Sequence, residues 1–465
     1  MPDARPFIPE LLAPAGDMEK LETAILYGAD AVYLGGEGLN LRAGAGGFDR
    51  QALDQAVTRA HQAGVKLYYT LNVYPRQSHM RAVREQIETL GELKPDAIIA
   101  ADPGIIRLLR RELPEIPVHI STQANTSNVE AVRFWRENGA KRVNVARELR
   151  SSELGEMLDA CRKQMPTMEL EVFTHGAMCM AVSGRCYMSA LLNDRPGNLG
   201  QCSHPCRYEY RPVSMTFEER TRPGEKLWEI REYSHPFTEE FTFDAPEEFA
   251  FSTPDHDGST SQSPADRALS AALDTDNWTK FFAAEDLCLL HYIEWFRRMK
   301  VASLKIEGRT KSSAYLAQVV DAYKTALNHA ATGRFQPEIY LSELVNAASR
   351  PLTTGFFDPA CRGPIAQPPD PTEKRPVLAR ILSPLASGRW LVQTKARWDT
   401  GEPVEALVPG LIRPHISAED YGLEDETGQG AAISHPGQRA ILICDHPELK
   451  SGMFLRKPWD LDQLD

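Results

Sequence analysis

Short apolar runs alternate with longer amphipathic stretches along most of the chain. The apolar runs are often rich in β-branched residues and recur roughly every 20–35 residues, as βα units in a parallel sheet do. Helices are expected where apolar residues recur at helical spacing, as over Asp17–Tyr27, Asp49–Ala63 and Ser313–Ala331. The predicted strands are Glu10–Ala13, Ala31–Leu34, Lys66–Leu71, Ala97–Ala100, Val118–Ser121, Arg142–Ala146, Leu170–Thr174 and Ser303–Ile306.

Eight such strands with intervening helices predict an α/β fold, a TIM-like (β/α)8 barrel over residues 1–335. An open, doubly wound parallel sheet is the alternative. No GxGxxG motif opens the first unit, which disfavours a dinucleotide-binding sheet. Polar residues follow most of the strands, and in a barrel these would share the rim where active sites form.

The remaining segments have different patterns. Residues 211–278 are rich in Pro, Ser, Asp and Glu, which predicts a flexible acidic insertion. Residues 336–375 are Pro-rich and are interpreted as a linker or a wrapping segment. From 376 to 465, short β-rich runs punctuated by Gly and Pro predict a small C-terminal all-β barrel domain.

The charge of the chain is concentrated in the insertion. The net charge is −12, and residues 211–278 hold 15 acidic and 6 basic residues, a net of −9 that leaves −3 elsewhere. An acidic total argues against nucleic-acid binding, but an acidic segment does so only weakly. No apolar stretch is long enough to span a bilayer and no signal peptide is apparent. We therefore expect a cytoplasmic protein with no membrane association.

Four of the eight cysteines lie within 28 residues, spaced C-x6-C-x15-C-x3-C, and a fifth lies far along the chain. These five are Cys179, Cys186, Cys202, Cys206 and Cys288. Disulfides are unlikely in a large cytosolic chain, and thiolates suit zinc or iron–sulfur clusters. Paired CxxC knuckles, usual for zinc, are absent, so the spacing favours iron–sulfur. Zinc, or buried cysteines that bind no metal, remain the alternatives.

Long motifs around these cysteines resemble the U32 family, whose members carry the label of collagenase-like peptidases. The resemblance covers about residues 8–335 and is strongest in HGAMCMAVSGRCYMS and NLGQCSHPCRYEY. The segments ELLAPAGDMEKLETAILYGADAVYLGG and SLKIEGRTKSSAYLAQVVDAYKTAL match as well. Within the family, the chain is most similar to the branch that hydroxylates tRNA with prephenate.

This resemblance implies a [4Fe–4S] cluster and hydroxylation of a wobble uridine at C5, giving 5-hydroxyuridine without molecular oxygen as the source. It implies the tRNA anticodon loop as the partner and prephenate as a co-substrate. By comparison with relatives that hydroxylate the ubiquinone ring, the expected ligands are Cys179, Cys186, Cys202 and Cys288, with Cys206 as the alternative to Cys202. Hydroxylation of rRNA or of ubiquinone is an alternative activity.

Further site residues are expected beside the cysteines and at the strand ends. His175 and Glu307 are candidates for acid–base catalysis, although each could equally be a hydrogen-bonded structural group. Tyr208 is a candidate for stacking on a splayed base, as is Tyr210. The candidates for RNA phosphate contacts are Arg185, Arg207, Lys305 and Arg309, and also Arg42, Arg147 and Lys311.

A peptidase is the competing hypothesis. A cysteine protease needs one thiolate paired with a positioned histidine, and His175 or His204 lies near a cysteine in sequence. Five gathered cysteines fit that chemistry poorly, and neither HExxH nor GxSxG occurs. The sequence therefore favours the hydroxylase over the protease.

Overall fold

The computed structural model describes residues 6–41, 47–212, 228–231, 240–242, 285–358, 360–361, 363–370 and 373–458. These fall into two compact units, one made of residues 1–178 and 285–465 and the other of residues 179–284. Each unit is described by itself below. Arg42 and most of the predicted acidic insertion, including its expected flexibility, lie outside the described residues.

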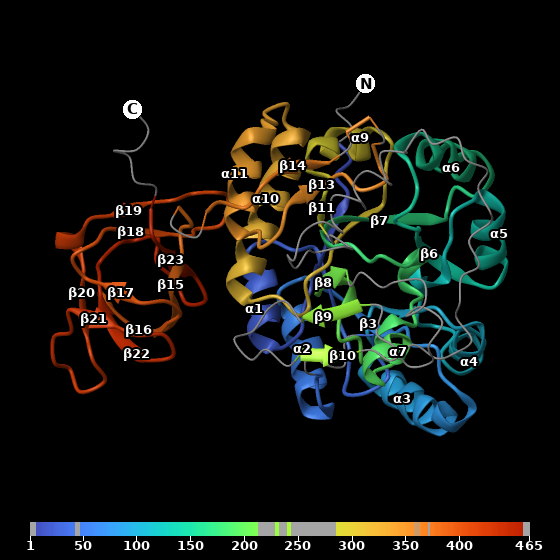
Figure 1. Cartoon of the computed structure of the whole chain (residues 1–465), viewed down its shortest axis with the longest axis horizontal. Helices are drawn as coiled ribbons and strands as arrows, with labels where there is room; N and C mark the ends of the chain where they lie inside the picture. Colours follow the sequence, from blue (N-terminus) through green and yellow to red (C-terminus); the bar gives the residue numbers. More distant parts are fainter. Residues whose placement is uncertain are drawn as a thin grey trace, which may run out of the picture. The chain divides into compact units, whose positions relative to one another are not determined.

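Eight parallel strands form a closed barrel in the first unit (Figure 1). Each strand pairs with the next in chain order, and the last pairs with both β7 and β1. At the closure Leu304 lies opposite Leu11 on one side and Val172 on the other. The strands are β1 (Glu10–Pro14), β2 (Ala31–Leu34), β3 (Lys66–Leu71), β4 (Ala97–Ala100), β5 (Val118–Ile120), β6 (Ala140–Asn144), β7 (Glu169–Ala177) and β12 (Ser303–Ile306). The predicted TIM-like barrel is confirmed, and the open sheet is excluded.

Helices cover the outside of this barrel, and polar caps fix where several of them begin. The Asp17 side chain accepts a hydrogen bond from Lys20 N at 2.8 Å, and Asp102 accepts one from Ile105 N at 3.0 Å. These two strand-end residues are therefore caps. The helices are α1 (Met18–Leu26), α2 (Arg50–Gln62), α3 (Met80–Leu93), α4 (Pro103–Glu112), α5 (Val129–Glu137), α6 (Ser151–Gln164), α9 (Ile293–Arg298) and α10 (Ser313–Ala331).

The apolar core lies mainly between the strands and these helices. It is continuous around the barrel, whereas a smaller apolar cluster inside the barrel includes Leu12, Tyr33, Tyr68 and Ile99. None of the described helices is both long enough and apolar enough to cross a membrane.

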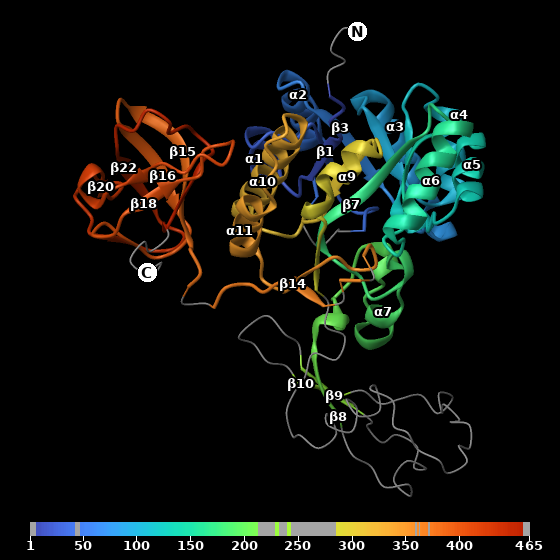
Figure 2. The same cartoon turned by 90° about the horizontal axis from the view of Figure 1, so that it is seen from above.

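Additional elements extend the barrel sheet beyond β7. Strand β11 (Asp286–Cys288) pairs antiparallel with β7, and β13 (Leu352–Thr353) and β14 (Pro364–Ala366) follow it. Helix α11 (Pro337–Ala347) lies beside α10 in both views (Figure 1 and Figure 2). The segment interpreted as a linker or a wrapping segment, residues 336–375, thus contains a helix and two short strands, because its apolar residues pack against the barrel core.

The C-terminal region is an antiparallel sheet of seven strands that forms a half-barrel, in the order β19-β18-β23-β15-β16-β22-β20. Two further short strands from the same region of the chain, β17 and β21, pair with each other in a separate sheet. The strands are β15 (Val377–Ala386), β16 (Arg389–Thr394), β17 (Trp398–Asp399), β18 (Val404–Ala406), β19 (His415–Ile416), β20 (Gly422–Glu424), β21 (Ile433–Ser434), β22 (Arg439–Ile443) and β23 (Phe454–Arg456). Its all-β character agrees with the sequence pattern.

A buried charge cluster joins this sheet to the barrel helices. The Arg456 guanidinium, fully buried, donates to Glu343 of α11 at 2.8 and 2.9 Å and to Glu405 of β18 at 2.7 Å. It also donates to Gln318 of α10 at 2.8 Å. We call these four residues the junction cluster. Every charge in it has a partner, as a buried ion requires.

Candidate functional site

The cysteine loop, residues 179–208, forms the described start of the second unit. It consists of short elements, the helix α7 (Met188–Asn193) and 3-10 turns at Val182–Gly184, Gly197–Leu199 and Pro205–Arg207. A small antiparallel sheet follows, formed by β8 (Glu209–Pro212), β9 (Trp228–Arg231) and β10 (Glu240–Thr242). Ser183, Asp194 and His204 have positive φ angles of 49°, 51° and 60°. Such conformations cost free energy in non-glycine residues and are enriched at functional sites.

A hydrogen-bond network of side chains holds the two halves of this loop together. The Ser189 hydroxyl accepts from Ser203 N at 2.9 Å and donates to Arg195 O at 2.6 Å. The Asn193 amide donates to Ser203 Oγ at 2.8 Å and to Tyr208 Oη at 2.9 Å. Because α7 follows Cys186 and Ser203 follows Cys202, this network brings the two cysteine segments together.

The four thiols of the loop act on one another electrostatically. Burial raises the pKa of Cys206, Arg207 opposes the rise, and the charges of Cys179, Cys202 and Cys186 add to it. Burial likewise raises the pKa of Cys186, against a hydrogen bond from Met188 N and together with the charges of Cys179 and Cys202. Thiols that oppose one another's ionisation gain from a shared cation, which removes that repulsion.

Two of these sulfurs accept backbone hydrogen bonds. Met188 N donates to Cys186 Sγ and His204 N donates to Cys202 Sγ, both at 3.4 Å. Hydrogen bonds of this kind support thiolate ligands and tune iron–sulfur clusters. Among the residues that the structure describes, however, no three potential ligands lie close enough together to hold a metal ion. The chemistry of the donors fits a soft metal ion or an iron–sulfur cluster.

Cys288, the remote predicted ligand, lies on β11 in the first unit. Its side chain is fully buried, and Tyr323 of α10 donates a hydrogen bond to its sulfur at 3.8 Å. Burial raises the pKa of Cys288 to about 11, against hydrogen bonds from Leu290 N and Tyr323. The thiol is therefore protonated at neutral pH in this environment. Its predicted role as a ligand stays a prediction.

Of the two predicted acid–base residues, His175 lies on β7 and Glu307 directly follows the neighbouring strand β12. Glu307 N donates to His175 O at 2.8 Å, and Gly176, with φ 106°, permits this approach because a Cβ there would overlap the Glu307 carbonyl. The two side chains have different surroundings. The His175 ring is buried beside Tyr323 and Tyr315 of α10, whereas Glu307 accepts a hydrogen bond from Tyr33 at 3.3 Å.

His175 is neutral at physiological pH. Burial lowers its pKa to about 4, with Asp286 opposing this shift and Lys311 adding to it. Its Nδ1 lies 3.4 Å from the Tyr323 hydroxyl. A buried neutral imidazole with this partner is a weak base, so the geometry supports a structural role more directly than proton transfer. Catalysis by His175 and Glu307 stays a prediction.

Two of the predicted RNA-binding cations are buried in the barrel. Lys305 donates to Glu171 at 3.2 Å and lies 4.4 Å from the centre of the Tyr33 ring. Arg309 donates to Thr70 at 3.1 Å and to Asn40 at 2.6 Å. Side chains with these partners are poorly placed for a phosphodiester backbone, which is met at the surface. Their role in RNA binding stays a prediction.

The loop residues predicted to contact RNA divide into two groups. Arg185 is exposed and Arg207 is half-buried, so both reach the surface of the loop. Tyr208 is buried, and its hydroxyl belongs to the network described above, so it braces the loop instead of presenting a stacking face. Sequence reasoning overlooked Tyr187, which is 80% exposed and directly follows Cys186. Its position within the cysteine motif is the sequence signal that could have identified it as a candidate.

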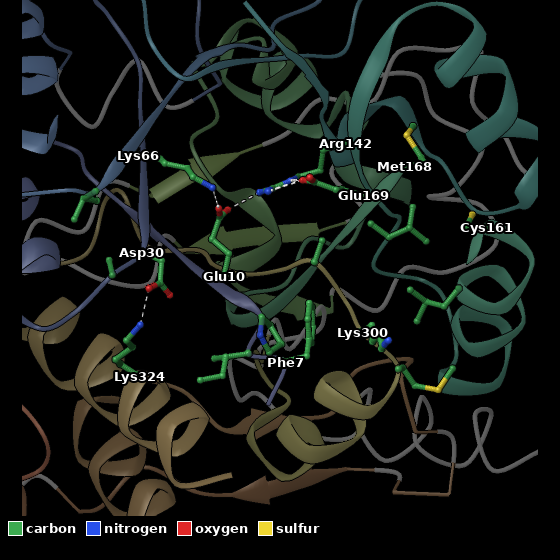
Figure 3. Close-up of a pocket in the computed structure, with 18 of the residues that line it drawn as sticks. Phe7, Glu10, Asp30, Lys66, Arg142, Cys161, Met168, Glu169, Lys300 and Lys324 are labelled. Atoms are coloured by element: carbon green, nitrogen blue, oxygen red, sulfur yellow. Dashed lines mark hydrogen bonds and ion pairs between the residues drawn. The ribbon is translucent and has the colours of Figure 1, made fainter. Parts of the chain in front are cut away.

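A cavity of about 990 Å³ opens at the end of the barrel where the parallel strands begin (Figure 3). Figure 3 shows Glu10 between Lys66 and Arg142, with ion pairs of 2.9 and 2.5 Å, and Asp30 paired with Lys324 at 2.6 Å. These charges neutralise one another. In such barrels the active site lies where the strands end, so we infer that the ion pairs of this pocket stabilise the fold.

Comparisons with known proteins agree with the motifs. The model of Peptidase family U32 matches residues 16–362. The chain is 35% identical over 357 residues to tRNA hydroxylation protein P of Haemophilus influenzae, covering 76% of this chain and 74% of the relative. It is 36% identical over 372 residues to the protein of the same name in Escherichia coli, covering 76% and 75%. It is also 36% identical over 201 residues to the 23S rRNA 5-hydroxycytidine C2501 synthase of Escherichia coli, covering 43% and 29%.

Proposed function

Because the chain belongs to Peptidase family U32, we propose that it is an RNA-modifying enzyme that hydroxylates C5 of a wobble uridine in tRNA. The observation that carries this proposal is its similarity, over 76% of its length, to relatives named for tRNA hydroxylation. The relative named for 5-hydroxycytidine synthesis acts at the same position of a pyrimidine ring, in ribosomal RNA.

Hydroxylation of a pyrimidine carbon is an oxidation, and protein side chains alone do not supply the redox step. A [4Fe–4S] cluster, when bound, would supply electron transfer. The chain contributes soft thiol ligands in the cysteine loop, and the N–H groups of Met188 and His204 orient two of the sulfurs. Prephenate as co-substrate and the cytoplasm as compartment complete the proposal.

We propose Cys179, Cys186, Cys202 and Cys288 as the four ligands, with Cys206 as the alternative to Cys202. The family resemblance carries this assignment. Anaerobic purification of the single variants Cys202→Ala and Cys206→Ala separates these two alternatives. The variant of the true ligand loses the broad visible absorbance of the cluster, as variants of Cys179, Cys186 and Cys288 should, and the other variant keeps it.

Three of the five cysteines do not have the lowered pKa that a peptidase nucleophile needs. A nucleophilic cysteine has a lowered pKa, usually beside a protonated histidine. Here burial raises the pKa of Cys186, Cys206 and Cys288. The family's peptidase label therefore does not decide the chemistry of this chain.

The decisive experiment is mass spectrometry of tRNA nucleosides from a strain lacking this gene. We expect 5-hydroxyuridine derivatives to disappear and to return with the wild-type gene. The double variant Cys179→Ala, Cys186→Ala should not restore them, whereas Cys361→Ala, a half-exposed cysteine outside the loop, should. Unchanged nucleosides in the deletion strain, with no second pathway operating, would refute the assignment.

A further inference from the structure

An exposed aromatic side chain directly follows Cys186 in the cysteine loop. Tyr187, at 80% exposure, is the most exposed large hydrophobic side chain among the described residues. It is the N-cap residue of α7, so the helix fixes the position of its backbone while its ring is largely in solvent. An exposed aromatic group of this kind indicates a binding surface more than a folding role.

Other residues near Tyr187 in the sequence also have exposed side chains. Met180, Val182 and Leu191 are 55%, 59% and 62% exposed, although residues of these types are usually buried. Arg185 and Arg195 are exposed as well. A loop that exposes both apolar side chains and guanidinium groups suits a partner that is both planar and anionic.

The local charge is opposite to that of the chain. Residues 179–208 contain three arginines and one aspartate, a net of +2, whereas the whole chain carries −12. A positive segment in an acidic protein attracts a polyanion and reduces nonspecific attraction elsewhere. This complementarity favours RNA as the occupant over an apolar protein surface.

We propose that Tyr187 is the stacking platform for an unpaired base of the substrate RNA, and that Arg185 and Arg195 contact the flanking phosphates. The inference rests on the proposed function, which it deepens by naming the residue that receives the base. Unpaired bases of RNA loops are held by aromatic stacking, and arginines bind the backbone beside them. Tyr208, the residue that the sequence favoured, cannot do this because its ring is buried.

The test is the affinity of the purified full-length protein for an anticodon stem–loop RNA with unmodified uridine at the wobble position. Tyr187→Leu, which keeps apolar bulk but loses the ring face, should weaken binding by roughly five- to one-hundred-fold, the range for losing one stacked base. Tyr187→Phe keeps the ring and should bind within about twofold of wild type, because stacking does not need the hydroxyl.

Two controls isolate the stacking contact. Phe134 on α5 is another exposed aromatic residue, at 51%, and Phe134→Leu should leave RNA affinity unchanged. A duplex RNA made from the same stem offers no unpaired base, so wild type and Tyr187→Leu should bind it equally. Arg195→Gln should weaken the binding of both RNAs. It should also reduce the slope of log affinity against log salt concentration by about one, which corresponds to one phosphate contact.

The outcomes separate this inference from the proposed function. If the wild-type gene restores 5-hydroxyuridine while Tyr187→Leu binds the stem–loop as tightly as wild type, the stacking role is wrong and the function stands. If Tyr187→Leu instead slows only reduction of the protein by an electron-donor protein, the surface serves that partner and the proposal is overturned. If the wild-type protein neither binds the RNA nor restores the nucleoside, the proposed function itself fails.

Discussion

The junction cluster and the cysteine loop both organise polar side chains, but by different means. In the junction cluster, Arg456 is fully buried and its charge is balanced by Glu343 and Glu405. In the cysteine loop, neutral hydroxyl and amide groups hold a half-exposed segment that contains three non-glycine residues with positive φ. The first arrangement is stable only while every charge keeps its partner, and the second can change locally without unfolding the barrel.

This contrast indicates how the chain separates stability from chemistry. The barrel and the junction cluster keep their apolar and charged groups away from water, whereas the loop exposes its cysteines and Tyr187 partly to it. Changes in the junction cluster should therefore lower the stability of the whole protein, and changes in the loop should alter only the loop.

The largest expected effect comes from Arg456→Ala. Removing this side chain leaves Glu343 and Glu405 buried without their main partner, which typically costs about 3–5 kcal/mol in the free energy of unfolding. Urea denaturation followed by circular dichroism measures it. The matched control is Lys457→Ala, because the Lys457–Glu402 pair is about half exposed and should contribute less than about 1 kcal/mol. Equal losses in the two variants would contradict the comparison.

The next effect is a pH dependence of stability that arises from Glu343 in the junction cluster. Burial alone would raise the pKa of Glu343, but the hydrogen bonds and charge of Arg456, with Arg413, lower it from 4.5 to about 2. A carboxylate with a depressed pKa contributes stability that is present above pH 4.5 and is lost as the pH falls toward 2.

Glu343→Gln should therefore be less stable than wild type by about 3 kcal/mol at neutral pH, and this difference should shrink on acidification. Urea midpoints of both proteins over a series of pH values check this. A difference that stays constant as the pH falls below 4.5 would mean that Glu343 keeps an ordinary pKa.

The smallest effect belongs to the cysteine loop. Tyr208→Phe removes the hydroxyl that accepts from Asn193 at 2.9 Å, which should cost about 1 kcal/mol. Because the network is local, we expect faster hydrogen exchange within residues 179–208 and an unchanged urea midpoint for the whole protein. Tyr187→Phe loses an equivalent hydroxyl from an exposed ring and should change neither measurement. A global loss of stability in Tyr208→Phe would show that the loop is part of the cooperative core.

The sequence predicted more of the barrel than of the site. Apolar periodicity located all eight barrel strands and placed the helix Ser313–Ala331 with its observed bounds, because the core around a barrel repeats one local pattern. The many prolines of residues 336–375 indicated a linker or a wrapping segment, and in the structure α11 and β13 of this segment pack against the barrel core.

The cysteine positions, the net charge and the family motifs were readable from the sequence alone, because they depend only on which residue stands where. Which side chains are buried depended on the tertiary structure. Lys305, Arg309 and Tyr208 belong to residue types that are often exposed, and the packing of distant segments enclosed them. Tyr187 shows the opposite outcome: it is largely in solvent because no described segment packs over it. Burial is a property of long-range contacts, and local sequence patterns do not encode those contacts.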